Sequence, residues 1–417
     1  MDSIASLQAA PRSWLIGSVL APHSDAFVAH LRRRRYAAST ARSYLGSMAH
    51  LARWMSHCCL PLGQLDEHAF EQFVGRHLPH CDCPPPVVRD RATVRAACTQ
   101  LLAMLREQQI IAEPIRATGP IEDELARYEA HMRDAQGLAA GTRRGRLRLV
   151  RRLLRYRFAD RPVVIAQLQP QELRQFIERQ LDLRTTASNA LTLTSALRAY
   201  LRYRGSCGDR VQALVSAIAS PAQWSLAVLP RALTRAEINR LLRSFTAALP
   251  APRRGLAMVR CALDLGLRSG EVAHLQLADI DWRAGTITLK GTKSHRQDLL
   301  PLPASTGRAL AAYLRHERPK TSNPAVFVRC LAPRDQPIGV DAVRRVICDA
   351  YRRIGLTHGR THALRHALAC RLLDQGSSLK EVADVLRHRS LNTTLIYAKL
   401  DHRRLSGVAL PWPGSTP

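Results

Sequence analysis

The stretch at 361–366 reads Thr-His-Ala-Leu-Arg-His, and it is followed by Val-Leu-Arg-His at 385–388 and Thr-Thr-Leu-Ile-Tyr at 393–397. Thr361 can cap a helix on which His362, Arg365 and His366 share one face, because they are spaced i, i+3 and i+4. Ser378 and Glu381 have the spacing of a capping box and predict a second helix. A third short segment carries Tyr397. Three helices separated by turns can therefore bring these side chains to one pocket.

The residue types in this pocket point to chemistry on a phosphodiester. Arginine is a planar, permanently charged fork that matches phosphate oxygens, and histidine can exchange protons near neutral pH. A tyrosine phenol can act as a covalent nucleophile. The alternative is that the same residues are scattered basic groups on a solvated helix face.

The composition sets the class of protein. The 417 residues suffice for two or three domains, and 46% of them are hydrophobic, which excludes a disordered chain. A formal net charge of +29 indicates a polyanionic partner, DNA or RNA, more than a membrane surface. No apolar run approaches the roughly 20 residues that span a bilayer, and the first residues lack the pattern of a signal peptide. We therefore expect a cytoplasmic protein.

The order His362, Arg365, His388, Tyr397 resembles the C-terminal signature of the tyrosine recombinases, or phage-type integrases. The histidine of the second motif comes 23 residues after the arginine, and the tyrosine comes nine residues later. The resemblance covers roughly 118–417. It implies a mainly α fold with a small β-sheet in an α+β catalytic domain, and helical SAM-like DNA-binding modules. It also implies site-specific recombination or integration, in which DNA is cut and rejoined through a 3′-phosphotyrosine.

Two further parts of the family's site have counterparts upstream. Arg268, in Gly-Leu-Arg-Ser-Gly-Glu, resembles the family's first arginine, and Glu271 stands where the family carries a bracing acid. Two short strands are predicted at 286–289 and 298–302, joined by a basic stretch, and the family places its catalytic lysine in such a hairpin. Counting back from the second strand favours Lys293, with Lys290 as the alternative. The competing interpretations are a surface ion pair and a solvated lysine.

The resemblance implies a role for each residue. Arg268 and Arg365 would clamp the scissile phosphate, and Tyr397 would attack it. His362 would take the phenolic proton or help to position it, and Lys293 would protonate the leaving 5′-oxygen. His388 would donate to a phosphate oxygen, with Glu271 and His366 in support. The reaction needs no metal, ATP or other cofactor. The family usually has glycine where this chain has Arg387, which would add a phosphate contact or shift the turn.

The rest of the chain is predicted to be helical. We divide it into an arm (1–23), a helical module (24–112), a core-binding helical domain (118–220) and the catalytic domain (226–417). The two modules share a weak repeat, and Ser39 is expected to cap a helix in the first. The residues expected to contact DNA are Arg42, Thr142, Arg143, Arg144, Arg146, Lys290, His295 and Arg296.

One cluster in the first module is open to two interpretations. His57, Cys58, Cys59, His77, His80, Cys81 and Cys83 are zinc-type ligands within a short span. Their spacing does not match the paired C-x₂₋₄-C pattern of common zinc sites. We interpret the segment as a helix end followed by a proline linker, with a structural zinc as the alternative.

The expected partners are double-stranded recombination sites, three further copies of the chain in a tetramer on DNA, and accessory DNA-bending or directionality proteins. Two other functions share part of the pattern. A type IB topoisomerase uses the same residue types to relax DNA, and a non-catalytic DNA-binding protein could keep the fold and the charge.

Overall fold

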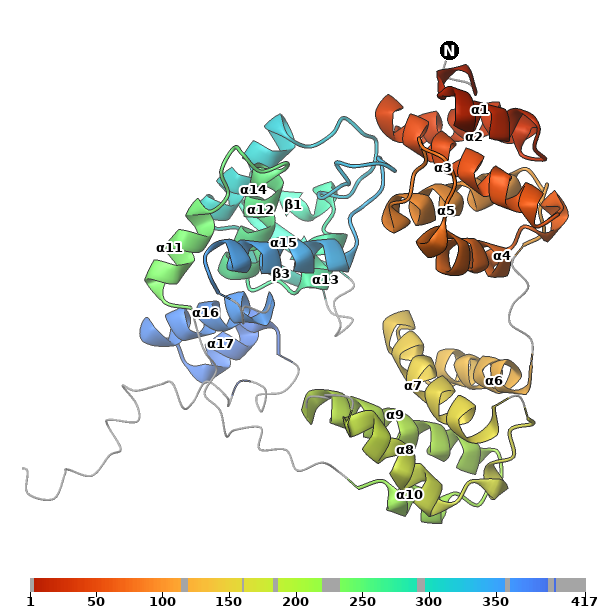
Figure 1. Cartoon of the computed structure of the whole chain (residues 1–417). Helices are drawn as coiled ribbons and strands as arrows, with labels where there is room; N and C mark the ends of the chain where they lie inside the picture. The colour runs from red at the N-terminus through yellow and green to blue at the C-terminus, as the bar shows by residue number, and fades with distance from the viewer. Residues whose placement is uncertain are drawn as a thin grey trace, which may run out of the picture. The chain divides into compact units, whose positions relative to one another are not determined.

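The computed structural model describes residues 4–113, 119–159, 161–182, 187–219, 233–290, 297–356, 361–388 and 394 (Figure 1). Helices dominate, and a small three-stranded sheet accompanies them, as the sequence predicts. Among the described residues, no helix is both long and apolar enough to cross a membrane. Buried side chains gather in separate cores along the chain, and each part is described by itself.

The first part of the chain surrounds a core built from Phe27, Leu45, Phe73 and Leu101 and their neighbours. Its helices are α1 (Ala9–Ile16), α2 (Ser24–Arg33), α3 (Ala38–His57), α4 (Glu67–Gln72) and α5 (Arg91–Glu107). A π-helical turn, Phe73–His77, continues directly from α4.

Two expectations for this part are wrong. The segment expected to be a weakly patterned arm contains α1, which buries Leu15 completely and packs against α3. Eight residues are too few to display a helical period, so the pattern could not reveal it. Ser39 lies inside α3, because the backbone is already extended at Ala37 and helical from the next residue.

The second helical part spans 119–219 and has its own core around Tyr128, Leu153 and Tyr200. Its helices are α6 (Pro120–Asp134), α7 (Ala140–Phe158), α8 (Pro170–Asp182), α9 (Ala187–Ser206) and α10 (Gln212–Ala217). Glu124 has no exposed surface and accepts hydrogen bonds from Tyr200 Oη at 2.9 Å and Arg204 Nη1 at 2.9 Å. This buried network joins α6 to α9.

The last part contains the helices α11 (Arg235–Arg243), α12 (Pro252–Asp264), α13 (Ser269–His274), α14 (Ala304–His316), α15 (Val340–Arg353), α16 (Thr361–Asp374) and α17 (Leu379–Leu386). Thr234 and Glu237 form a capping box at α11, and Ser378 and Glu381 form the predicted one at α17. Each box satisfies backbone N–H groups that a helix start leaves unpaired.

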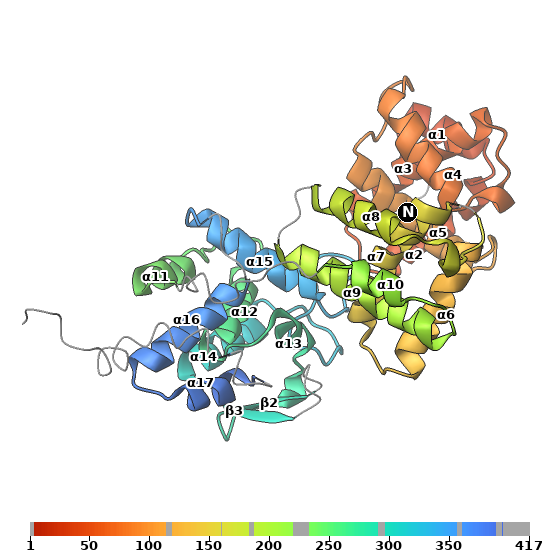
Figure 2. The same ribbon diagram turned by 90° about the horizontal axis from the view of Figure 1, so that it is seen from below.

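The predicted strands form an antiparallel hairpin (Figure 2). β2 (Thr286–Leu289) and β3 (Asp298–Pro301) pair with Ile287 opposite Leu300, and a two-residue strand, β1 (Ile280–Asp281), adds to the other edge of β2. The sequence analysis did not anticipate β1.

Candidate active site

A cavity of about 720 Å³ opens between α13, β2, α15 and α16. Its lining includes the cations Arg268, Lys290 and Arg344, the carboxylates of Glu271 and Asp279, and the imidazole of His362. Residues from four separate elements therefore meet there. Two of them, His362 and Arg268, were expected in the site from the sequence. A concave surface with several positive side chains is suited to an anionic ligand.

Arg268 precedes α13 and is tied to that helix by Glu271. The Arg268 backbone N–H donates to Glu271 Oε2 at 2.8 Å, and its Nη1 donates to Oε1 at 2.7 Å. The Arg268 side chain keeps 29% of its surface exposed, whereas that of Glu271 keeps 8%. The buried acid therefore fixes the orientation of an arginine that still reaches the cavity, so the pair is not an ion pair exposed on the surface.

The turn before Arg268 depends on Gly266. Its φ is +60°, and a Cβ built there would lie 2.9 Å from Leu386 Cδ2 and 3.0 Å from Leu368 Cδ2. Only glycine avoids both the left-handed strain and these clashes. The close approach lets Arg365, which is 6% exposed, donate from one guanidinium to the carbonyls of Gly266 and Leu386. Arg365 thereby joins the turn that carries Arg268 to the end of α17.

Arg387 takes over the position where a glycine was expected. Its backbone has φ +54° and ψ +50°, the left-handed conformation that ends α17. Its side chain is buried, and Nη2 donates to Glu271 Oε2 at 3.0 Å and to the Gly266 carbonyl at 3.3 Å. The Arg387 carbonyl in turn accepts from Arg268 Nη2 at 3.4 Å. Arg387 therefore adopts the backbone conformation of the turn, and its buried side chain links Glu271 to the Gly266 carbonyl.

Glu271 thus lies between two arginines. Burial opposes ionisation of its carboxyl group, but Arg387, the Arg268 backbone N–H and the Arg268 guanidinium outweigh that effect and lower its pKa. Burial in turn lowers the pKa of Arg387. The carboxylate is charged at neutral pH and compensates both cations.

The histidines of α16 border the same region. His362 is exposed at the cavity, and His366 is half-buried one turn further along. Partial desolvation of the His362 ring lowers its pKa, and the charges of Arg365 and Arg268 act in the same direction. Burial also lowers the pKa of His366. His362 is therefore a neutral imidazole at pH 7, the form that can accept a proton.

His388 follows the turn at Arg387 and is oriented by a residue that the sequence analysis assigned no role. Its Nδ1 lies 2.7 Å from the hydroxyl of Thr394, which is only 1% exposed. Burial lowers the pKa of His388 to about 4, and the charges of Arg365 and Arg268 act in the same direction. Because Nδ1 is engaged with the hydroxyl, Nε2 is the atom available to a ligand.

The basic hairpin is described only in part. Lys290, at the end of β2, lines the cavity and lies 3.3 Å from Asp279 Oδ1. Lys293, His295, Arg296 and Tyr397 lie outside the described residues.

The DNA-contact candidates of the helical parts lie on two helices. Arg42 is exposed on α3, and Thr142 and Arg144 are exposed at the start of α7. Arg143 is engaged within the protein, since its Nη1 donates to the Leu138 carbonyl at 2.5 Å. Arg146 is half-buried.

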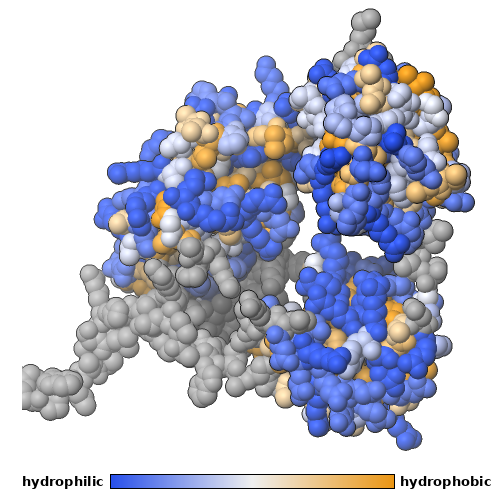
Figure 3. Space-filling model, viewed as in Figure 1, coloured by the Kyte–Doolittle hydropathy of each residue, from blue (hydrophilic) through white to orange (hydrophobic). Residues whose placement is uncertain are grey.

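The structure adds two residues on α7, Arg148 and Arg152, that the sequence analysis missed. Together with the predicted Arg144 they are exposed and follow one another at i+4 spacing, so the three form a basic stripe along one side of the helix. Charge spacing on a predicted helix could have revealed this stripe. The visible surface over this part of the chain is largely hydrophilic (Figure 3).

Comparisons with known proteins agree with this geometry. The sequence model described as the phage integrase family matches residues 231–404. The protein named integrase/recombinase y4rA of Sinorhizobium fredii is 36% identical over 395 residues, which are 93% of this chain and 93% of that protein. The tyrosine recombinase XerD of Yersinia pestis is 28% identical over 57% of this chain and 79% of its own length. A crystal structure of a lambda integrase dimer bound to a COC′ core site shares the fold, with a TM-score of 0.53 and 18% identity over 78% of this chain and 90% of that one.

Proposed function

This chain belongs to the phage integrase family of tyrosine recombinases, and we propose that it recombines specific DNA sites through a covalent 3′-phosphotyrosyl link on Tyr397. The observation that carries the assignment of roles is the convergence of Arg268 and Arg365 around the Gly266 turn, with His388 near enough for both charges to lower its pKa, beside a cavity that Arg268 lines. Such an arrangement supplies several fixed donors to one phosphate group.

The two arginines are proposed to bind the non-bridging oxygens of the scissile phosphate. The attacked phosphorus becomes pentacoordinate, and negative charge accumulates on those oxygens. Arg268 is held by Glu271 and Arg365 by two backbone carbonyls, so neither has to be ordered during the reaction. His388, turned by Thr394, adds a donor from Nε2.

The bond changes balance without an external reagent. The Tyr397 oxygen forms a bond to phosphorus, and the bond from phosphorus to the 5′-oxygen breaks. His362 accepts the phenolic proton, and Lys293 gives a proton to the leaving 5′-oxygen. The phosphodiester energy stays in the phosphotyrosyl link, and a 5′-hydroxyl from a partner strand reverses the step. Because arginines supply the positive charge, the scheme routes no step through a metal ion.

The remaining parts of the chain are proposed to hold the DNA. The separate cores support a division into a helical module, which the first core extends from 24–112 to include Leu7 and Leu15, a core-binding domain (118–220) and a catalytic domain (226–417). The stripe of Arg144, Arg148 and Arg152 on α7 would follow a phosphate backbone. We further propose that the chain forms a homotetramer on two DNA sites, together with accessory DNA-bending or directionality proteins. It would act in the cytoplasm, in DNA integration or transposition.

The test is a suicide-substrate assay. The protein is incubated with duplex DNA from the ends of its own genetic element, nicked so that a cleaved fragment diffuses away and traps the intermediate. A covalent protein–DNA band on a denaturing gel is expected for the unaltered protein and not for Tyr397→Phe. Tyr351→Phe is the matched control, because that tyrosine is buried on α15 and should not affect cleavage. A band from Tyr397→Phe would refute the assignment of the nucleophile.

A modified substrate separates the two lysines. Replacing the 5′-bridging oxygen with sulfur gives a leaving group that needs no proton from the enzyme. If Lys293 is the general acid, the Lys293→Ala variant should not cleave normal DNA but should still cleave the sulfur substrate. The variant Lys290→Ala should then show no such rescue, because Lys290 pairs with Asp279. Rescue of Lys290→Ala alone would transfer the role to that residue.

Strand exchange is distinguished from relaxation with a second pair of substrates. Two duplexes of different length that carry the site should give products of recombinant length. Relaxation of a supercoiled plasmid without such products would favour a topoisomerase-like activity.

A further inference from the structure

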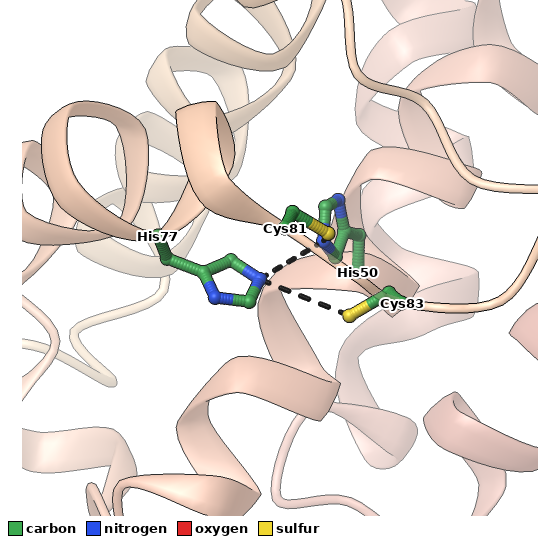
Figure 4. A group of neighbouring side chains, drawn as sticks. All are labelled: His50, His77, Cys81 and Cys83. Carbon is green, nitrogen blue, oxygen red and sulfur yellow. Dashed lines mark hydrogen bonds between the residues drawn. The ribbon is translucent and has the colours of Figure 1, made fainter.

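Four potential metal ligands meet in the first helical part of the chain, away from the active site (Figure 4). His50 lies on α3, and His77 ends the π-helical turn after α4. Cys81 and Cys83 lie in the segment that leads to α5. The ligand atoms of the four side chains all lie within 4.8 Å of one another.

The separations match those of a tetrahedral zinc site. The two Nε2 atoms of His50 and His77 are 3.2 Å apart, Cys81 Sγ is 3.2 Å from His50 Nε2, and Cys83 Sγ is 3.9 Å from His77 Nε2. Usual Zn–N and Zn–S bond lengths in a regular tetrahedron give about 3.3 Å between two nitrogens and about 3.6 Å between nitrogen and sulfur. These three pairs are within a few tenths of an ångström of those values, and with all pairs inside 4.8 Å a movement of about 1 Å or less would accommodate the ion.

The surroundings of His50 orient it as a ligand. Its Nδ1 lies 3.2 Å from the Val88 carbonyl, and a carbonyl can only accept, so Nδ1 carries the proton. The other nitrogen, Nε2, is left with a lone pair directed into the cluster. Metal-bound histidines commonly have this arrangement, in which a second hydrogen bond fixes the tautomer.

The site is built into the core of this part of the chain. His50 is fully buried, and Cys83 is 4% exposed. The Phe73 ring stacks on His77 at 5.5 Å between centroids and meets His50 edge-on at 5.2 Å. The Phe73 ring therefore covers one side of the cluster, while His77 and Cys81 stay partly exposed.

We propose that His50, His77, Cys81 and Cys83 bind one Zn²⁺ ion. Two thiolates and two imidazoles are a donor set that zinc prefers, and four protein ligands close the coordination shell, which is the mark of a structural rather than a catalytic site. The ion fastens the middle of α3 to the segment between α4 and α5. Residues 81–90, which carry the two cysteines, form no helix or strand, so the metal supplies a constraint that their backbone does not.

The proposed ligands differ from those that the sequence suggested. His57, Cys58, Cys59 and His80 are exposed and lie outside the group. His50 was not considered, because it is 27 residues from His77 and lies within a helical pattern. Only the packing of α3 against the later segment brings the ligands together.

The experiment measures the metal content of the full-length protein purified under reducing conditions without added chelator. About one zinc ion per chain is expected by elemental analysis. Replacement by Co²⁺ should give the visible absorption of a tetrahedral site and a thiolate charge-transfer band. The variants Cys81→Ser and Cys83→Ser should lose the zinc and the band, whereas the control Cys58→Ser/Cys59→Ser should keep both. Removal of zinc by a chelator should lower the melting temperature.

A different result would overturn the proposal. The unaltered protein would have to retain its helical circular dichroism, contain no zinc after incubation with the ion and melt at the same temperature with or without it. The four side chains would then form a metal-free hydrogen-bond network. If the Cys81→Ser and Cys83→Ser variants still contain zinc and the Cys58→Ser/Cys59→Ser control does not, the zinc site lies elsewhere. Neither measurement depends on the recombination activity.

Discussion

Replacing Glu271 with glutamine should destabilise the active site and slow DNA cleavage, because one carboxylate serves two arginines there. Its two oxygens accept three hydrogen bonds, two from Arg268 and one from Arg387. A glutamine can reproduce the acceptor at Oε2, but its NH₂ group would then face the donor Arg268 Nη1. The substitution therefore removes the charge and sets two donors against each other.

The magnitude follows from burial. The side chains of Glu271 and Arg387 are 8% and 4% exposed, so their pair has little screening, whereas Arg268 is 29% exposed and contributes less. Breaking a fully buried ion pair costs about 3–5 kcal/mol, which makes roughly 3 kcal/mol a reasonable loss of stability for Glu271→Gln. A displacement of Arg268 by about 1 Å would slow cleavage by roughly 10²-fold.

Two measurements test this. Hydrogen exchange of peptides from 261–275 and 379–388 reports the local stability, and single-turnover cleavage of the suicide substrate reports the rate. Asp349→Asn is the matched control, since Asp349 pairs with Arg352 on the surface, neither residue lines the cavity, and such a pair is worth about 0–1 kcal/mol. Arg387→Met completes a double-mutant cycle with Glu271→Gln. A loss below about 1 kcal/mol, or a coupling energy near zero, would refute the bracing role.

Four further predictions follow, three from the histidines of the active site and one from the basic stripe on α7. Thr394→Val, which keeps the shape but removes the hydroxyl from His388 Nδ1, should slow single-turnover cleavage about tenfold and cost about 1 kcal/mol, while Thr394→Ser should retain the rate. Because the pKa of His388 is about 4 and that of His362 is lowered, kcat/KM for cleavage should fall to half its plateau value at a pH below the ordinary histidine pKa of 6.5; a half-maximal loss at or above pH 6.5 would contradict this. The unfolded chain takes up protons near pH 6.5 and the folded His388 does not, so unfolding experiments should show stability falling as the pH decreases from about 6.5 toward 4. Arg144→Gln and Arg148→Gln should each reduce the slope of log K against log salt in DNA binding by about 0.9 if the residue contacts a phosphate, and an unchanged slope would exclude that contact.

Short-range features of this protein are legible in its sequence because they depend on neighbouring residues. The capping boxes at Thr234 and Ser378 formed as predicted, since both partners lie within one helical turn. The hairpin of β2 and β3 and the break at Gly266 also follow from local pattern. Motif spacing was enough to identify the family, because the catalytic residues occupy set positions along consecutive elements.

Other features required the tertiary structure, because they join residues far apart in the chain. The contact of Arg387 with Glu271 links positions 116 residues apart, and no local rule predicts a buried arginine in a left-handed turn. The role of Thr394 depends on how the chain folds back onto His388.

The cluster around His50 shows the same limit most clearly. Sequence alone supplied histidines and cysteines of the zinc-binding type but suggested partners by their proximity along the chain. Packing of α3 against the segment before α5 selected a different set, since a metal site is defined by distances in space. Sequence by itself therefore determined the family and most of the helices and predicted the catalytic residue types, while tertiary packing decided which side chains brace the active site and which ones meet to hold an ion.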